Sequence, residues 1–269
     1  MPAINTNVAA LFAQQSLKVN ERNQSNAMRQ LSTGSRVNTA ADDAAGMAIG
    51  QTMTAQVKGL NQAVRNVNDG INMMQTAEGA LGETSNMLQR MRELAVQSAN
   101  GTYSTTQRGY LQTEFEALSA QIGKIASDTK WNDQSLLGAA ATFTFQAGKD
   151  SGQTVAVAVG AMTLAGLNLT TLISVGVNAS ASLASLDAAI GTVNSQRATI
   201  GAGINQMTYA VDNLSNVSAN VAASRSTIMD TDYATASTQL SKTQIIQQAA
   251  TAMLAQANQQ PQSVLALLK

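Results

Sequence analysis

The stretch that decides the fold runs from residue 42 to residue 99 and reads DDAAGMAIGQTMTAQVKGLNQAVRNVNDGINMMQTAEGALGETSNMLQRMRELAVQSA. Mostly apolar side chains recur along it at alternating spacings of four and three residues: Met53, Val57, Leu60, Val64, Val67, Ile71, Met74, Glu78, Leu81, Ser85, Leu88, Arg92 and Ala95. A sustained repeat of this kind predicts a helix that wraps on partner helices. The helix would be roughly 85 Å long, which no compact domain of this size needs.

The beginning of this helix carries a signal of its own. Thr39-Ala40-Ala41-Asp42 fits a capping box, and the carboxylates of Asp42 and Asp43 favour the positive end of a helix. Glycines inside the helix weaken it, because each costs about 1 kcal/mol relative to alanine. These glycines are Gly59, Gly70, Gly79 and Gly82. The repeat passes through all of them without a slip, so we predict one continuous helix.

Two further stripes predict partners for this helix. A short one predicts a helix from Thr105 to Thr129, with apolar side chains at Leu111, Phe115, Leu118, Ile122 and Ile125. A long one predicts a helix of roughly 70 Å, with its stripe at Leu183, Leu186, Ile190, Val193, Arg197, Ile200, Ile204, Met207, Val211, Leu214, Ser218, Val221, Arg225 and Ile228. The two long helices can bury each other's stripes, with the short helix as a third layer.

Between the second and third stripes the period changes from helical to alternating. Residues 142–146 (TFTFQ) and 155–159 (VAVAV) alternate, with the turn sequence GKDSG at 148–152. This pattern predicts a β-hairpin near 141–160. We expect residues 161–180 to be extended or looped. The apolar run 155–173 contains glycine, threonine and asparagine without aromatic or arginine anchors, so we predict no membrane span there.

The two ends of the chain differ from these long stripes. An amphipathic N-terminal helix begins with Ile4, Val8 and Leu11 and runs to about Leu31, with Gly34 placed as its C-cap. At the other end we expect one shared apolar face at Leu240, Ile246, Ala250, Met253 and Ala257, followed by a further apolar segment that holds Leu265 and Leu268. Neither arm has enough apolar area to be stable alone. We therefore expect both arms to be disordered in the monomer and to fold against partners.

Composition excludes several classes of protein. The chain has no cysteine and no histidine, so zinc sites of the usual ligands, disulfides and histidine-based nucleophile triads cannot be built. Lysine plus arginine and aspartate plus glutamate both number 16, and a neutral chain is a poor nucleic-acid binder. Asp42 and Asp43 could be called paired catalytic carboxylates, but helix capping explains them better. We predict no enzyme activity, no metal and no cofactor.

Motifs at both ends of the chain resemble bacterial flagellins. The N-terminal motifs, in order, are INTN at 4–7, LSTGSRVN at 31–38, DDAAG at 42–46, KGL at 58–60, NDGI at 68–71, QTAEGAL at 75–81 and QRMRELAVQSAN at 89–100. The C-terminal motifs are SRS at 224–226, DTDYA at 230–234 and LAQANQ at 254–259. The resemblance covers about residues 1–140 and 181–269.

The resemblance implies a mainly α protein, built as a long antiparallel helical rod or coiled-coil bundle with a small β-hairpin region. In the family, residues matching 1–40 plus 232–269 form terminal coiled-coil arms in the filament core, and residues matching 41–180 plus 181–231 form a helical rod domain. The chain has no large outer domain and resembles a minimal flagellin. The arm residues implied in polymerisation are Ile4, Val8, Leu11, Leu240, Ile246, Leu254, Leu265 and Leu268.

The resemblance also implies a life history and partners. Flagellins lack a cleaved signal and leave the cell unfolded through the flagellar export channel, and residues 1–7 (MPAINTN) show no basic start or apolar core of a signal peptide. The implied location is extracellular, in the flagellar filament. The implied partners are other copies of the chain, an export chaperone, and the cap and junction proteins of the flagellum.

A further implied partner is the host Toll-like receptor 5. Arg90, Leu94 and Glu114 occupy positions that match the receptor-contacting patch of detected flagellins, and Gln89, Glu93 and Gln97 surround them. Arg90 and Leu94 lie four residues apart and outside the 4,3 stripe, so we expect them on one exposed face that also serves subunit contacts. The alternative is an ordinary charged, solvated helix face.

Two other roles within the same family stay open at this point. One is a hook–filament junction protein, although such relatives match the central motifs less well. The other is a cell-surface homologue that captures a polysaccharide. Sugar binding usually needs aromatic platforms, and Trp131 stands nearly alone beside Asn132 and Asp133, so we interpret it as a loop anchor.

Overall fold

The structure is a computed structural model that describes residues 7–169 and 179–267. It confirms a mainly helical protein with a small antiparallel strand region, in the order α1 (Val8–Thr33), α2 (Ala44–Ala99), α3 (Thr105–Asp128), β1 (Lys130–Trp131), β2 (Gln134–Ser135), β3 (Ala141–Gln146), β4 (Thr154–Val159), α4 (Ala179–Met229) and α5 (Tyr233–Leu267). The chain forms two compact units, which are residues 56–219 and residues 1–55 with 220–269.

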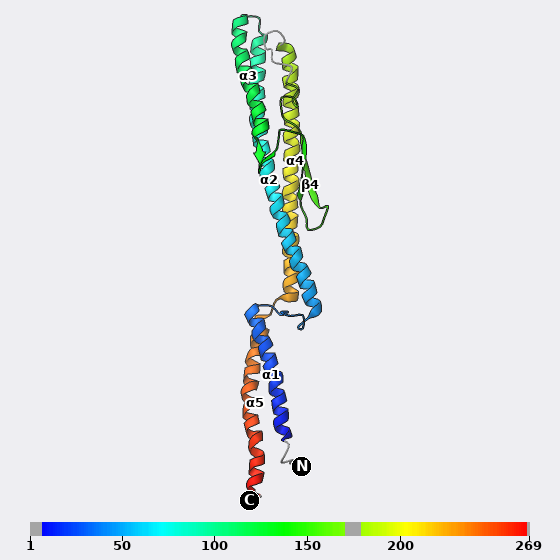
Figure 1. Cartoon of the computed structure of the whole chain (residues 1–269), viewed down its shortest axis with the longest axis vertical. Coiled ribbons are helices and arrows are strands. Elements are labelled where there is room, and N and C mark those ends of the chain that lie inside the picture. Colours follow the sequence, from blue (N-terminus) through cyan, green and yellow to red (C-terminus); the bar gives the residue numbers. More distant parts are fainter. Residues whose placement is uncertain (1–6, 170–178, 268–269) are drawn as a thin grey trace. The chain divides into compact units, whose positions relative to one another are not determined.

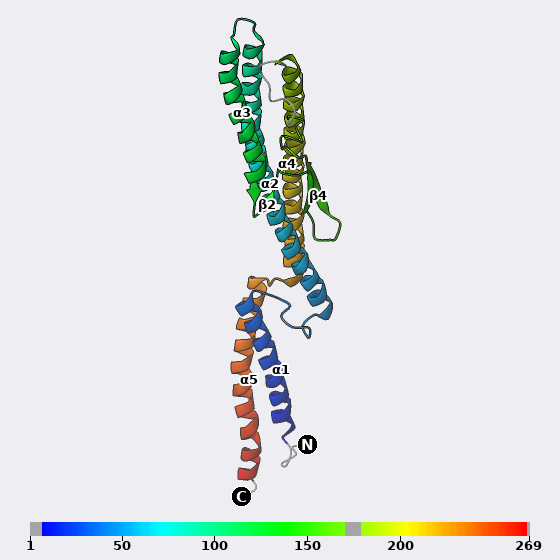
Figure 2. The ribbon, with the colours of Figure 1, turned by 45° about the horizontal axis from the view of Figure 1, so that its top comes forward.

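The central unit, residues 56–219, is built around one large apolar core, and a smaller cluster joins Leu60, Ala63 and Leu214. Helices α2, α3 and α4 lie side by side in both views of Figures 1 and 2. The core joins buried side chains of all three helices with those of β4 and the segments around it, among them Met74, Leu81, Leu88, Phe115, Ile122, Leu136, Val157, Leu186, Val193, Ile200 and Met207. The three predicted helices are therefore confirmed, and the middle parts of their stripes form the core.

One helix face was predicted wrongly. Leu94, expected on an exposed face, has none of its surface accessible to solvent, and Met91 beside it is equally buried. Arg92, which the stripe places inside, is exposed. The reason is that this part of α2 packs against α3 as well as α4, so its buried face is wider than a single 4,3 stripe.

Helix α2 begins at Ala44, four residues after Ala40, the first helical residue that a capping box at Thr39 would give. The side chain of Asp43 accepts a hydrogen bond from the backbone N–H of Gly46 at 2.8 Å, so Asp43 caps the helix. Asp42 instead closes the preceding turn, where its Oδ2 accepts from the backbone N–H of Thr39 and from the Thr39 hydroxyl, both at 2.9 Å. The expectation that Thr39 caps the helix was wrong.

The predicted hairpin is confirmed as β3 and β4. The strands are antiparallel, with Phe143 opposite Val157 and Phe145 opposite Val155. Two helix glycines admit it: a Cβ added at Gly70 of α2 would lie 2.7 Å from the Phe145 ring, and one added at Gly203 of α4 would lie 2.7 Å from a Val157 methyl. The hairpin therefore touches both long helices where they carry no side chain.

A second, smaller hairpin was missed by the sequence analysis. Strands β1 and β2 pair across Asn132 and Asp133, which both have positive φ angles of 47° and 64°. Trp131 is half-buried against the core, as the anchor interpretation expected. After β4, Met162, Leu167 and Leu169 are buried in the same core, so part of the predicted loop packs inside.

Along the two described stretches, no helix combines the length and the apolar content needed to cross a membrane.

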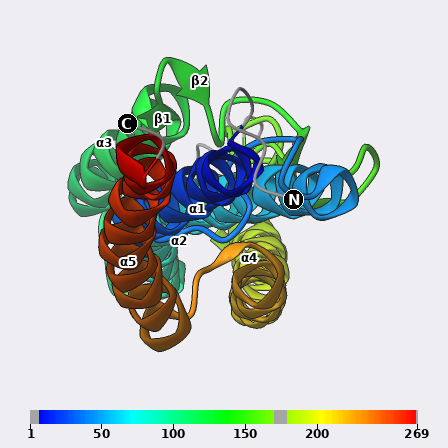
Figure 3. The same ribbon diagram turned by 90° about the horizontal axis from the view of Figure 1, so that it is seen from below.

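The second unit pairs the terminal helices α1 and α5, which Figure 3 shows next to each other. Gly34 ends α1 with a φ of 70°, and its N–H donates to Gln30 O at 2.9 Å, which confirms the predicted C-cap. The Gly34 carbonyl accepts from the Thr231 N–H at 2.9 Å, and Ser35 forms a bridge with Asp230. These bonds tie the end of α1 to the beginning of α5.

Candidate functional site

The seam between α1 and α5 is made of small and polar side chains. On α1 the buried and half-buried residues follow the 3,4 repeat Ala10, Ala13, Leu17, Asn20, Gln24, Ala27 and Leu31, and on α5 they follow the 4,3 repeat Ala236, Leu240, Thr243, Gln247, Ala250, Leu254 and Ala257. Two side-chain amides set an antiparallel alignment. Asn20 Nδ2 donates to Thr243 O, and Asn7 Nδ2 donates to Ala257 O, both at 2.8 Å.

Apart from the four leucines Leu17, Leu31, Leu240 and Leu254, the large apolar side chains of this pair lie outside the seam. Phe12 exposes 71% of its surface, and Met253 exposes 66%. The other exposed large apolar residues of the pair are Val8, Leu11, Val19, Met28, Ile245 and Ile246. A surface with this much exposed apolar area is typical of a site where another macromolecule binds.

Of the predicted arm residues, Val8 and Leu11 are exposed, whereas Leu240 and Leu254 face the seam. The single face expected for α5 was wrong, because Ile246 and Met253 are exposed while Leu240 and the alanines of that set are half-buried. In the antiparallel pair, the face of α5 that packs on α1 is instead the one that contains Thr243 and Leu254. Ile4, the Leu265 side chain and Leu268 lie outside what the structure describes.

The second candidate surface lies where α2 meets α3. Arg90 Nε contacts Glu114 Oε1 at 2.9 Å, and its Nη1 contacts Glu93 Oε2 at 3.0 Å. The hydrogen bonds that Arg90 donates to Glu114 and, with a smaller effect, to Glu93 raise the pKa of Arg90, so the guanidinium stays charged. All three side chains are about half exposed or more, which keeps each pair weak in water.

The rest of this patch is divided between surface and core. Gln97 is exposed, and its Nε2 donates to the Tyr103 hydroxyl at 3.1 Å. Gln89, which directly precedes Arg90 in α2, is also exposed. Leu94 belongs to the core and cannot be touched by a partner while α3 covers it. The structure therefore brings Arg90, Glu93 and Glu114 together as one ionic cluster and removes Leu94 from it.

Arg92 forms a separate link. Its Nε lies 2.6 Å from Asp187 Oδ1 on α4, and this hydrogen bond raises the pKa of Arg92. Glu78 and Arg197, two charged members of the predicted stripes, pair at 2.7 Å and join the same helices lower down. These charges bridge neighbouring helices across the rim of the core.

The described part of the chain offers no arrangement of side chains suited to catalysis or to metal binding. Asp42 is occupied in the turn before α2, where the hydrogen bonds from the Thr39 backbone and hydroxyl lower its pKa. Among residues 7–169 and 179–267, no group of three or more acidic side chains is placed to hold a metal ion.

Comparison with known proteins gives two family matches that together span most of the chain. The description "Bacterial flagellin N-terminal helical region" matches residues 4–142, and "Bacterial flagellin C-terminal helical region" matches residues 183–268. Between the two matches lie residues 143–182, which contain most of β3, all of β4 and the beginning of α4.

Full-length relatives agree with these matches. The flagellin of Halalkalibacterium halodurans is 41% identical over 99% of both chains. The flagellar filament 33 kDa core protein of Treponema phagedenis is 39% identical, again over 99% of both chains. The crystal structure of Bacillus cereus flagellin is 33% identical and superposes with a TM-score of 0.51, covering 56% of this chain and 88% of that one.

Proposed function

This chain belongs to the bacterial flagellin family, and from that premise we propose that it is exported through the flagellar channel and polymerises through the outward apolar side chains of its terminal helices. Family membership makes it a structural subunit of the flagellar filament, outside the cell, and not an enzyme. An export chaperone and the cap and junction proteins complete the proposed set of partners.

The observation that carries the proposal is the placement of apolar side chains in the α1–α5 pair. Alanine, polar side chains and four leucines form the seam, while Leu11, Phe12, Ile245 and Met253 face outward. Fully burying one such side chain contributes about 1.5–3 kcal/mol. A helix pair that leaves these residues in water gains this free energy only when further copies of the chain cover them.

A full-length double variant tests this proposal. Leu11→Gln with Phe12→Gln should prevent seeded polymerisation, because it removes apolar area without touching the seam. Ser25→Gln, an exposed change on the same helix, is the matched control and should polymerise normally. Sedimentation after addition of filament seeds measures assembly, and circular dichroism checks helix content. Filaments of normal yield from the double variant would contradict the proposal.

We also propose that the arms are disordered before assembly. Ordering costs about 1–2 kcal/mol per backbone residue, and the seam of α1 and α5 buries few large apolar side chains to offset it. Limited proteolysis of the soluble subunit should leave a fragment of about residues 40–235. The same arms should resist digestion in the filament, and equal resistance in both states would argue against disorder.

Recognition by Toll-like receptor 5 is proposed for the ionic cluster of Arg90, Glu93 and Glu114, with Gln89 and Gln97 beside it. The exposed guanidinium held between two carboxylates supports this assignment. Arg90→Ala should weaken receptor binding by the monomer and lower filament yield, while thermal stability changes by less than about 1 kcal/mol. Arg65→Ala, another exposed arginine of α2, is the control. Unchanged affinity of the Arg90 variant would end the receptor proposal.

The alternatives within the family are less well supported. The relatives that match over 99% of both chains are named as a flagellin and a filament core protein, which favours a filament subunit over a junction protein. Trp131, the candidate for sugar stacking, is half-buried against the core.

A further inference from the structure

Methionine is the side chain of this protein that peroxides oxidise most readily, because the chain has 12 methionines and no cysteine. Five of the described methionines, Met73, Met74, Met91, Met162 and Met207, are buried, and Met47, Met53, Met87 and Met229 are half-buried. Two are openly exposed, Met28 on α1 at 55% and Met253 on α5 at 66%. Both lie on the terminal helix pair, but their surroundings differ.

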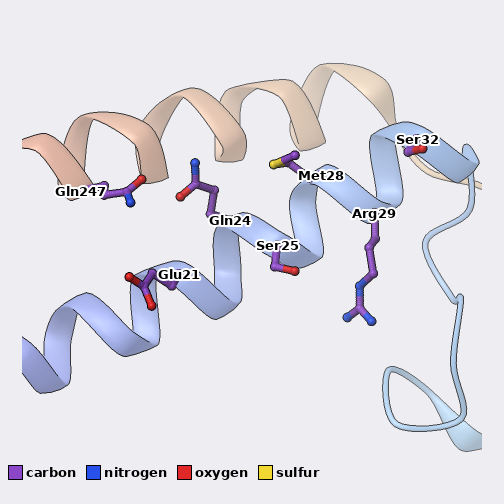
Figure 4. Close-up of a pocket in the computed structure, with 7 residues that line it drawn as sticks. All are labelled: Glu21, Gln24, Ser25, Met28, Arg29, Ser32 and Gln247. Atoms are coloured by element: carbon purple, nitrogen blue, oxygen red, sulfur yellow. The ribbon is translucent and has the colours of Figure 1, made fainter.

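Met28 lies on the polar side of the pair. Figure 4 shows it at a shallow groove along α1, facing the side of α5 that carries Gln247. The other residues that line this groove are Glu21, Gln24, Ser25, Arg29 and Ser32. We call this side the polar flank. Charged and hydroxyl side chains surround Met28, so a more polar group there changes little.

Met253 lies on the opposite side of the seam, which we call the apolar flank and define by Phe12, Val19, Ile246 and Met253. Val19 and Ile246 line one groove between α1 and α5. Phe12 precedes Val19 by seven residues, which is about two helical turns, so both lie on one face of α1. Met253 follows Ile246 by seven residues, so these two share one face of α5.

The alignment of the two helices brings these two pairs to matching levels. Asn20 lies opposite Thr243, and Asn7 lies opposite Ala257. Val19 is therefore level with Ile246 to within about one helical turn, and Phe12 is level with Met253 to the same tolerance. All four side chains are exposed. The apolar flank thus holds two pairs of large apolar groups, each pair shared by both helices. The polar residues Gln15, Ser16, Asn20 and Asn23 line the same groove as Val19 and Ile246.

We propose that Met253 is an oxidation site that controls assembly: a peroxide converts its thioether to a sulfoxide in the free subunit, and the apolar flank then fails to pack on a second copy of this chain. The inference rests on the proposed function, since it takes the terminal pair as the polymerising surface. The second copy is the occupant because the family polymerises with itself and the apolar flank carries no charged side chain.

The chemical step is balanced with hydrogen peroxide as the oxidant. The methionine sulfur attacks one peroxide oxygen, the O–O bond breaks, and an S–O bond forms. The sulfur is oxidised by two electrons, the peroxide is reduced, and water leaves after proton transfer within the peroxide. The product is a polar, chiral sulfoxide that methionine sulfoxide reductases can return to the thioether. A sulfoxide oxygen that is buried against large apolar groups, such as the Phe12 ring, loses its hydrogen bonds to water, and this loss costs free energy.

The test measures the critical concentration for seeded polymerisation before and after the full-length subunit is treated with hydrogen peroxide. Peptide mass spectrometry gives the oxidised fraction of Met28 and Met253 in each sample. Oxidised wild type and oxidised Met28→Leu should show a critical concentration raised about tenfold, whereas Met253→Leu should assemble normally after treatment. Reductase treatment of oxidised wild type should restore assembly.

A second pair of variants removes the oxidant from the test. Met253→Gln places a polar group of similar length on the apolar flank and should raise the critical concentration about tenfold, whereas Met28→Gln should not. In finished filaments treated with peroxide, Met253 should be oxidised much less than Met28. The proposal is overturned if Met253→Leu loses assembly as strongly as wild type, if fully oxidised Met253 leaves assembly unchanged, or if Met253→Gln behaves as Met28→Gln does. If untreated wild type does not polymerise on seeds, the proposed function fails instead.

Discussion

Replacing Leu94 by alanine distinguishes a role in core packing from a role in receptor contact. The loss of folding stability that it causes can be predicted from the structure. The side chain is fully buried and belongs to the cluster that contains Leu88, Met91 and Phe115. Buried leucine-to-alanine changes cost about 2–5 kcal/mol, part from lost apolar burial and part from the cavity that remains. The rigid α2–α3 contact cannot collapse freely, so we expect about 3 kcal/mol. For a unit of this size the melting temperature should fall by about 6–12 °C.

The assay is thermal unfolding of the full-length subunit, followed by circular dichroism, beside receptor affinity measured well below the melting temperature. Gln89→Ala, an exposed change five residues earlier on α2, is the control and should melt as wild type does. Receptor affinity per folded molecule should be nearly unchanged in Leu94→Ala. A melting temperature within about 2 °C of wild type, together with reduced affinity, would refute the reasoning and return Leu94 to the contact surface.

The other predictions concern the backbone and acid stability. Gly70→Ala should destabilise the central unit by about 1–3 kcal/mol, because its Cβ would meet the Phe145 ring. Gly79→Ala, with open space around it, should stabilise the same helix by about 0.5–1 kcal/mol, and urea unfolding distinguishes the two. The pKa of Asp42 is lowered from 3.8, so its stabilising effect is present above that pH and is lost as the pH falls through the lower folded-state value. Asp42→Asn should flatten this acid-side loss, as a titration of thermal stability would show.

The sequence predicts the helices and the hairpin well because their side chains repeat with the period of the structure they form. The α2 stripe and the α4 stripe are long, so single exceptions such as Glu78 do not disturb them. The alternation in 141–146 and 154–159 is equally direct. The small hairpin at Asn132 and Asp133 was missed, although two residues that tolerate positive φ are a turn signal.

The candidate site was predicted less fully, because the 4,3 apolar repeat marks a face for only one partner helix. Helix α2 packs against two helices, α3 and α4. Leu94 lies outside the seam with α4 but inside the contact with α3, and no spacing within α2 shows that second contact. For α5, the apolar residues Ile246 and Met253 suggested a face that the structure does not bury. The actual seam includes the polar residues Thr243 and Gln247, which hydrophobic periodicity does not mark.

The hairpin's seating on two helix glycines has a mechanical consequence for the central unit. A slide of α2 along α4 would carry Gly70 away from the Phe145 ring and bring Val67 or Met74, the next side chains on the same face of α2, toward it. The same movement would displace Val157 from Gly203. The hairpin therefore resists sliding of the two long helices along their axes, but it does not restrict their bending.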